Sequence, residues 1–337
     1  MSRAGVLAVR AAFLAALVGG VWSVSHRTPS GPVEEVGEAC AALDDLAGRL
    51  RAHVERLVGM GSRSWRHPET LARAATWIES TWEGLGWRVE RQPVSELGQS
   101  YVNLIAFPDD RGWEVERVLL GAHYDAVEGT PGADDNASAV AVLLEVSRLV
   151  AAGACSRPAV FAAFTLEEPP FFQTPRQGSW VFARTLRREG VALAGAIVLE
   201  MVGYYSRRPG SQSYPFPLGW FGYPDRGDFC GLIANRYSRG LLPQLAAAIR
   251  GAGLPVETLA VPGKGHLLEP VRFSDHASFW DLGYRAVMIT DTAFYRNPRY
   301  HGPDDTPETL DYESMARLTL GLARYLGCRP AEVPGER

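Results

Sequence analysis

Apolar residues recur at two different spacings along this chain, and the two spacings alternate between residues 38 and 326. Apolar positions three and four residues apart are typical of amphipathic helices. They occur at 38–60, 70–85, 137–152, 179–189, 241–251 and 312–326. Short, nearly continuous apolar runs predict buried strands. These runs lie at 87–91, 102–107, 118–122, 159–166, 196–199 and 286–290.

Strands that alternate with helices favour a largely parallel sheet, because parallel neighbours are usually joined by a crossover helix. We therefore expect an α/β fold, a three-layer α/β/α sandwich around a central, mostly parallel (mixed) sheet. Segment 206–231 interrupts the pattern with aromatic residues among prolines and glycines. We interpret it as a long loop folded over a site. The alternative is a surface excursion with its own small cluster.

The N-terminus predicts export. Arg3 and Arg10 precede an apolar run at 11–24, which matches the hydrophobic region of a secretory signal and is short for a membrane span of ~20 residues. The alternative is an uncleaved membrane anchor through residues 5–24. The expected division is a signal peptide or anchor at 1–25, a linker at 26–37, one domain at 38–328 and a tail at 329–337. The protein would be periplasmic, secreted or membrane-anchored.

Composition narrows the class of protein. Apolar residues make up 46% of the chain, enough for a large core, and the formal net charge is −4. No basic patch stands out, which argues against a nucleic-acid partner. None of the cysteines at 40, 155, 230 and 328 forms a C-x-x-C pair, so a cysteine zinc site is not expected. One or two disulfides could form in an oxidising compartment, with the pairing left open.

Side chains that can bind metal follow several of the predicted strands. They are His123 and Asp125, then Glu167 and Glu168, then Glu200, and finally Asp291 with Tyr300 and His301 in the loop beyond. Ligands of open parallel sheets gather at the carboxyl ends of strands, so a shared site is expected there. Asp134 and Asp135 lie on a tight loop directly before the helix at 137–152. A carboxylate on such a loop can bridge two cations, and its neighbour can support it.

Taken together, six motifs resemble the M28 family of zinc peptidases, in family order over roughly residues 40–326. They are Gly121-Ala122-His123-Tyr124-Asp125, the loop 132–138 (Gly-Ala-Asp-Asp-Asn-Ala-Ser), Glu167-Glu168, Glu200-Met201-Val202-Gly203, Ser274-Asp275-His276, and 300–306 (Tyr-His-Gly-Pro-Asp-Asp-Thr). The resemblance implies a zinc-dependent exopeptidase fold. It also implies a metallo-aminopeptidase that binds two zinc ions and releases residues from the N-termini of peptides or proteins.

The resemblance also assigns roles position by position. His123 and Glu200 would bind one zinc, Glu168 and His301 the other, and Asp135 would bridge both. Glu167 would act as general base toward a metal-bridging water. Asp125 and Asp134 would support the ligands, and Tyr300 would hydrogen-bond the oxyanion or merely pack.

The sequence departs from the family pattern at two positions, and three rival functions are considered. Ala139 stands where the loop motif often has glycine, and little effect is expected because it falls inside a helix. Glu200 stands where much of the family has aspartate, which could change the binding mode or metal preference. A glutaminyl-cyclase-like enzyme, with one zinc and N-terminal glutamine as substrate, is the main rival. A carboxypeptidase or a hydrolase of small amides is the second. A binding module that has lost its chemistry would lack ligands, whereas all five ligands and the base are present.

Overall fold

The computed structural model describes residues 36–329. The expected signal peptide or anchor at 1–25 lies outside this range, as do residues 26–35 of the predicted linker and 330–337 of the predicted tail. Within residues 36–329, no helix is both long enough and apolar enough to cross a membrane.

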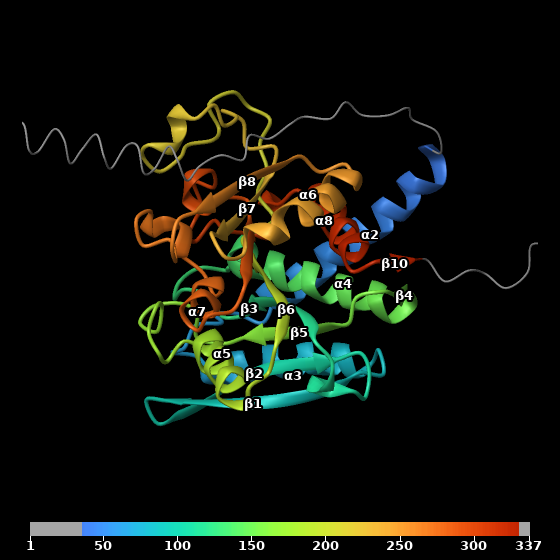
Figure 1. Ribbon diagram of the computed structural model, residues 1–337, viewed down its shortest axis with the longest axis vertical. Helices are drawn as coiled ribbons and strands as arrows, with labels where there is room; N and C mark the ends of the chain where they lie inside the picture. The colour runs from blue at the N-terminus through green and yellow to red at the C-terminus, as the bar shows by residue number, and fades with distance from the viewer. Residues whose placement is uncertain (1–35, 330–337) are drawn as a thin grey trace, which may run out of the picture.

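The core of the molecule is one mixed sheet with the strand order β1-β2-β5-β3-β6-β9-β7-β8 (Figure 1). The strands are β1 (Arg88–Glu96), β2 (Gln99–Phe107), β3 (Arg117–His123), β5 (Ala159–Phe164), β6 (Leu193–Glu200), β7 (Cys230–Asn235), β8 (Val256–Val261) and β9 (Ala286–Thr290). Strand β3 pairs in parallel with β5 and β6, β6 pairs in parallel with β9, and β7 pairs in parallel with β8. Antiparallel pairs join β1 to β2, β2 to β5 and β7 to β9. The predicted mixed, mostly parallel sheet is confirmed.

Helices cover both faces of the sheet. One face carries α2 (Val36–Val58), α3 (Pro68–Glu83), α4 (Ala139–Ala152), α6 (Leu242–Gly251) and α8 (Tyr312–Tyr325), and the other carries α5 (Gly178–Glu189) and α7 (His276–Asp281). Neighbouring side chains of a strand point to opposite faces, so Leu120 joins the first core and Leu119 the second. Both faces are covered, which is why every residue of β3 is buried.

The sequence pattern missed strands β7 and β8 and helix α7, besides the two-residue strands and the short 3-10 helices. Strands β7 and β8 are six residues each and carry small or polar residues among the apolar ones, as in Val256–Val261 (VETLAV). Helix α7 has six residues, too few to establish a helical period. Strand β1 is also longer than predicted, since its second half lies at an edge with an exposed polar face.

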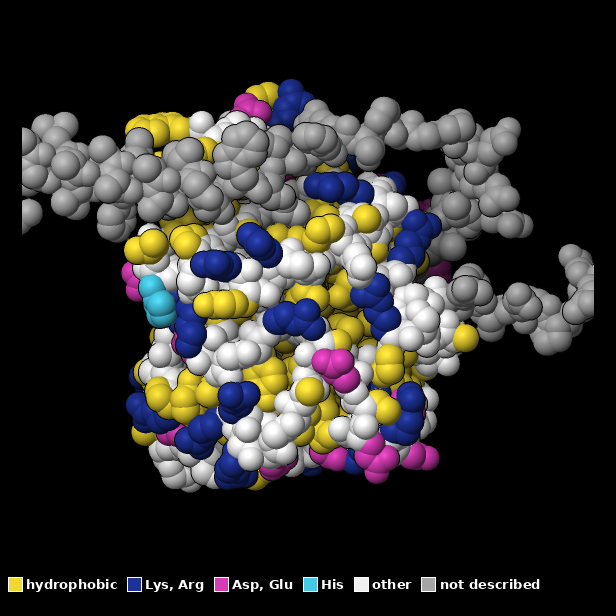
Figure 2. Space-filling view, viewed as in Figure 1, with side chains coloured by type: hydrophobic (Ala, Val, Ile, Leu, Met, Phe, Trp, Pro, Cys, Tyr) yellow, Lys and Arg dark blue, Asp and Glu magenta, His cyan; other side chains and the backbone are white. Residues whose placement is uncertain are grey.

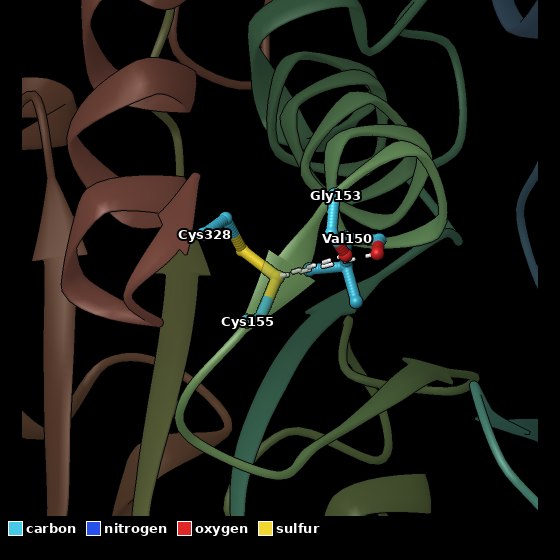
Figure 3. Close-up of a disulfide and its surroundings, with 4 residues drawn as sticks. All are labelled: Val150, Gly153, Cys155 and Cys328. Atoms are coloured by element: carbon cyan, nitrogen blue, oxygen red, sulfur yellow. Dashed lines mark hydrogen bonds between the residues drawn. A yellow bond between two sulfur atoms is a disulfide. The ribbon is translucent and has the colours of Figure 1, made fainter. Parts of the chain in front are cut away.

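A disulfide between Cys155 and Cys328 joins β4 (Ala154–Cys155) to β10 (Cys328–Arg329), which form a small separate sheet (Figure 3). The bond ties the segment after α4 to the segment after α8, 173 residues further along the chain. Closing so long a loop stabilises the fold by about 5 kcal/mol in the chain-entropy account. Cys230 is a buried free thiol.

On the face drawn in Figure 2, arginine and lysine side chains lie scattered among apolar and neutral ones. The absence of a nucleic-acid partner stays a prediction, and this face offers no basic stripe that speaks against it.

Candidate metal centre

The predicted metal ligands come together at the carboxyl edge of three neighbouring strands. His123 is the last residue of β3, Glu200 is the last residue of β6, and Glu168 follows β5. Asp135 lies in the short turn η2 (Ala133–Ser138), between β3 and α4, and His301 lies in the loop after β9. The parallel pairing of β5, β3 and β6 brings these ends to one edge.

Asp135 stands between two groups of ligands. Its Oδ1 lies 3.5 Å from Nε2 of His123, and its Oδ2 lies 3.1 Å from Nε2 of His301. Nε2 of His123 is also 3.3 Å from Oε2 of Glu200, whereas Nε2 of His301 is 3.6 Å from Oε2 of Glu168. Each oxygen of one carboxylate thus faces its own histidine and its own glutamate, which is the arrangement of a bridging ligand between two cations.

Several of these side chains carry polar atoms without a hydrogen-bond partner. Four buried atoms have no hydrogen-bond partner, namely Nε2 of His123, Oδ1 of Asp135, Oε1 of Glu168 and Nε2 of His301. A buried polar atom without a partner costs roughly 1–3 kcal/mol, so such atoms are rare outside functional sites. Three compact groups of ligand atoms form, namely His123-Asp135-Glu200, Asp135-Glu168-His301 and His123-Glu167-Glu168. Imidazole nitrogen and carboxylate oxygen are zinc ligands, so the donor set fits this metal.

Negative charge accumulates at the centre. Burial raises the pKa of Glu167 and Glu168 well above the usual range, and the carboxylate of Asp135 adds to the effect on Glu168. Burial also raises the pKa of Glu200, although the charge of His123 opposes it. Burial alone would lower the pKa of His123, but the charge of Glu200 and the other carboxylates outweighs it and raises that pKa well above its usual value. A bound cation would relieve this repulsion, because it favours the charged form of each carboxylate.

The backbone around the centre adopts conformations that L-residues rarely use. Leu166 (φ 57°) precedes Glu167, Met201 (φ 44°) follows Glu200, and His301 itself has φ 55°. Left-handed non-glycine residues cost of order 1–3 kcal/mol each and collect at functional sites. The strained positions therefore lie where the chain must turn to aim a ligand.

Asp125 holds the turn that carries both glutamates. Its Oδ1 accepts a hydrogen bond from the backbone N–H of Glu167, and its Oδ2 accepts one from that of Glu168, each at 3.1 Å. Nδ1 of His123 lies 3.2 Å from the backbone oxygen of Asp125 and 3.5 Å from its Oδ1. Asp125 therefore contacts the imidazole and also fixes Glu167 and Glu168 through their backbone.

Asp134 contacts the segments after β6 and β9. Its Oδ1 accepts from the backbone N–H of Gly203 at 2.9 Å, and its Oδ2 accepts from Nδ2 of Asn297 at 2.7 Å. Burial raises the pKa of Asp134 well above its usual range, and the charge of nearby Asp291 raises it further. Asp134 thus joins the bridging loop to the loop that leads to His301.

Three side chains that fix the ligands had no predicted role. Asp305 accepts hydrogen bonds from the backbone N–H groups of Asp134 and Asp135, and burial raises its pKa to about 7. Ser274 donates through Oγ to Oε2 of Glu200 at 2.8 Å. Asp305 lies in the motif at 300–306 and Ser274 in the motif at 274–276. Membership of these motifs is the sequence signal that could have identified them.

Arg63 is the third such side chain, and no local pattern marks it. It is 1% exposed and donates to the backbone oxygens of Tyr124, Pro131 and Gly132. These bonds hold the end of β3 against the loop that carries Asp135. Gly132 has φ 64°, and a Cβ there would meet the Arg63 guanidinium at 2.9 Å and the Asp135 oxygen at 2.6 Å.

Glu167 and Tyr300 lie at the edge of the same cluster. Oε2 of Glu167 is 4.0 Å from Nε2 of His123, and the side chain is 6% exposed. The ring of Tyr300 stacks on that of His301 at 3.7 Å between centroids. Burial raises the pKa of Tyr300, and the charge of Asp135 raises it further, so the hydroxyl keeps its proton. Their catalytic roles stay predictions.

The profile of peptidase family M28 matches residues 104–326 of this chain. The chain belongs to peptidase family M28. An uncharacterised protein of Escherichia coli, YfbL, is 39% identical over 274 residues, which cover 78% of this chain and 82% of YfbL. This chain is therefore a hydrolase of a peptidase family, as the motifs predicted.

More distant relatives of the M28 chain carry functional names. Leucine aminopeptidase 1 of Fusarium vanettenii is 26% identical, with 82% of this chain and 69% of the relative covered. Among solved structures, the LapA aminopeptidase of Legionella pneumophila superposes with a TM-score of 0.64 at 19% identity, over 89% of this chain and 76% of LapA. A glutaminyl cyclase of Porphyromonas gingivalis reaches 0.60 at 20% identity, over 83% and 97%. The two structural likenesses support the fold alone.

Proposed function

We infer that this chain is an exported aminopeptidase that binds two zinc ions and removes residues from the N-termini of peptides or proteins. The observation that carries the proposal is the placement of Asp135, whose two oxygens face His123 and His301 separately, at 3.5 and 3.1 Å. Glu200 would complete one zinc site and Glu168 the other. When bound, zinc would polarise the scissile carbonyl and lower the pKa of a water molecule toward about 7.

The chain's own residues would supply the proton transfers. Burial raises the pKa of Glu167, which brings a carboxylate closer to the working range of a general base. Glu167 would take a proton from the attacking water and deliver it to the departing amine. Tyr300 keeps its hydroxyl proton and would donate a hydrogen bond to the oxygen of the carbonyl as negative charge develops there.

Two observations support export. The apolar run at 11–24 follows Arg3 and Arg10, as in a secretory signal. Cys155 and Cys328 form a disulfide, and disulfides persist mainly in oxidising compartments such as the periplasm or the extracellular space.

A zinc and substrate assay on the purified protein tests the proposed function. We expect two zinc ions per chain and release of leucine from an N-terminal leucine amide, with loss of activity after chelation and recovery with zinc. One zinc per chain, together with cyclisation of an N-terminal glutamine peptide, would replace the aminopeptidase by a cyclase. Absence of zinc and of turnover would mean that the ligands do not act as proposed.

A further inference from the structure

An apolar cavity of about 100 Å³ lies beside the candidate metal centre, and Glu200 is part of its lining. Residues 204–229, which we call the excursion, close it on one side with Leu218, Tyr223 and Phe229. The excursion is the yellow segment at the top of Figure 1, near β7 and β8. Strand residues such as Ile233 and Met288 line the other side. The cavity thus connects the metal centre with the segment that interrupts the sequence pattern.

The side chains that line the cavity determine which kind of substrate side chain fits into it. Apart from Glu200 and Glu257, every lining side chain is uncharged, and most are aliphatic or aromatic. A pocket of this kind gains roughly 25 cal/mol for each Å² of apolar surface removed from water. A branched or aromatic side chain on the substrate would gain more there than the methyl group of alanine.

Arg296 fastens the excursion to the loop after β9. Its Nε donates to Oε1 of Gln212 at 2.8 Å, and one terminal nitrogen donates to the backbone oxygen of Tyr204 at 3.3 Å. The guanidinium also lies 4.6 Å from the ring centroid of Phe229 and 5.5 Å from that of Tyr205. Arg296 therefore contacts the excursion near both of its ends and along its length, which the planar fork of arginine allows.

Two further observations indicate that the contact between Arg296 and the excursion is a specific feature of the fold. Arg296 is 6% exposed, and at Gly227 an added Cβ would lie 2.6 Å from its Cδ and Nε, so only glycine lets the excursion approach this closely. Gln212 also donates to Oγ1 of Thr292 at 2.8 Å, and the N–H of Ser213 donates to the oxygen of Tyr295 at 2.9 Å. Burying an arginine is costly, so its place between two cavity walls calls for a reason.

We propose that Arg296 is a positioning residue that holds the excursion as one wall of this cavity, so that discrimination between large and small N-terminal side chains depends on this contact. This inference rests on the proposed aminopeptidase function. It assigns the selection to a contact between the excursion and the loop after β9, whereas the zinc ligands carry the reaction itself.

The test compares Arg296→Met with the wild-type protein. Methionine keeps the apolar packing on Phe229 and removes the hydrogen bonds to Gln212 and Tyr204. We expect the leucine-to-alanine ratio of kcat/KM for amide hydrolysis to fall about tenfold, mainly through a higher KM for leucine. The ratio of Kd values for free leucine and alanine, measured by calorimetry, should change in parallel, and Arg296→Lys should restore part of the preference.

Arg208→Met is the matched control, because Arg208 is an exposed arginine of the same excursion. It should keep the wild-type ratio. If Arg296→Met fails to fold, Gln212→Ala decides the question, because it removes the bond to Arg296 together with the bond to Thr292, both of which join the excursion to the loop after β9. An unchanged ratio in the folded variant, an equal loss of kcat for both amides, or a wild-type preference for lysine over leucine would overturn the inference. A wild-type protein that binds leucine over alanine but hydrolyses neither amide would refute the proposed function and leave the cavity assignment in place.

Discussion

The two histidines of the candidate metal centre are held in different ways. His123 ends β3 in the middle of the sheet, and its side chain is 1% exposed. His301 lies in a loop with a left-handed backbone, and its side chain is 29% exposed. We call His123 with Glu200 the inner half of the site, and His301 with Glu168 the outer half. The inner half is positioned by the sheet, whereas the outer half depends on loop contacts such as the stacked ring of Tyr300.

A second contrast concerns the two neighbouring glutamates, one of which would bind metal while the other would transfer protons. Glu167 and Glu168 are neighbours in sequence, yet the oxygen of Glu168 lies 3.6 Å from His301 whereas that of Glu167 lies 4.0 Å from His123. Adjacent side chains at the end of a strand point in different directions. One of the pair is thereby available as a ligand and the other as a proton carrier.

The largest expected effect is that of Glu167→Gln, the loss of the proposed base. We expect kcat to fall by about 10²–10⁴-fold, the usual contribution of a positioned acid–base group. The zinc content, measured by mass spectrometry of the metal, should stay at the wild-type value because Glu167 is not a proposed ligand.

The matched control for this change is Glu168→Gln, one residue further along. This variant should lose zinc from the outer half as well as activity. Loss of zinc in Glu167→Gln, or retention of full zinc content in Glu168→Gln, would exchange the two assignments.

The next largest effect concerns the stability of the metal-free protein. His123→Ala removes the partner of buried carboxylates, including Glu200 at 3.3 Å, and should lower the free energy of unfolding by about 3–5 kcal/mol. His301→Ala removes a partly exposed histidine and should cost less than about 1 kcal/mol. Denaturant unfolding in the presence of a chelator measures both values. Equal losses would mean that the two halves do not differ as their exposure indicates.

The smallest effect tests the support of the inner half. Ser274 donates to Oε2 of Glu200, so Ser274→Ala should weaken zinc binding there by about 10–100-fold, the usual effect of removing a hydrogen bond to a ligand. Competition with a chromophoric chelator measures the affinity of each zinc. A loss confined to the outer half would contradict the link between Ser274 and the inner half.

The sequence predicted the parts of the site that follow a strong strand pattern. Strands β3, β5 and β6 are buried on both faces and therefore read as continuous apolar runs, after which His123, Glu168 and Glu200 stand out. Strands β7 and β8 escaped the same reasoning because their mixture of small, polar and apolar residues has no clear period. Arg63 escaped it because its partners Tyr124 and Gly132 lie more than 60 residues away in the chain.

The excursion illustrates the same limit. Its aromatic composition predicted a loop over a site, and several of its residues, among them Tyr214, Leu218 and Phe229, line the cavity beside Glu200. The contact that fastens it, between Arg296 and Gln212, spans 84 residues and has no local signature. Charged side chains are rarely buried, so the amino-acid composition gave no reason to select Arg296 as a contact residue.

The sequence by itself determined the α/β class, the edge of the sheet that carries chemistry and the identity of the candidate ligands. Local periodicity and the alternation of strands and helices suffice for the fold class and for the edge, because they depend on neighbouring residues. The five candidate ligands were assigned by the motifs that resemble the M28 family. Only the tertiary structure decided that the two oxygens of Asp135 face different histidines, that Cys155 pairs with Cys328, and that Arg296 joins two walls of a cavity. These depend on distances between segments far apart in the chain, which packing of the whole fold sets and no local pattern encodes.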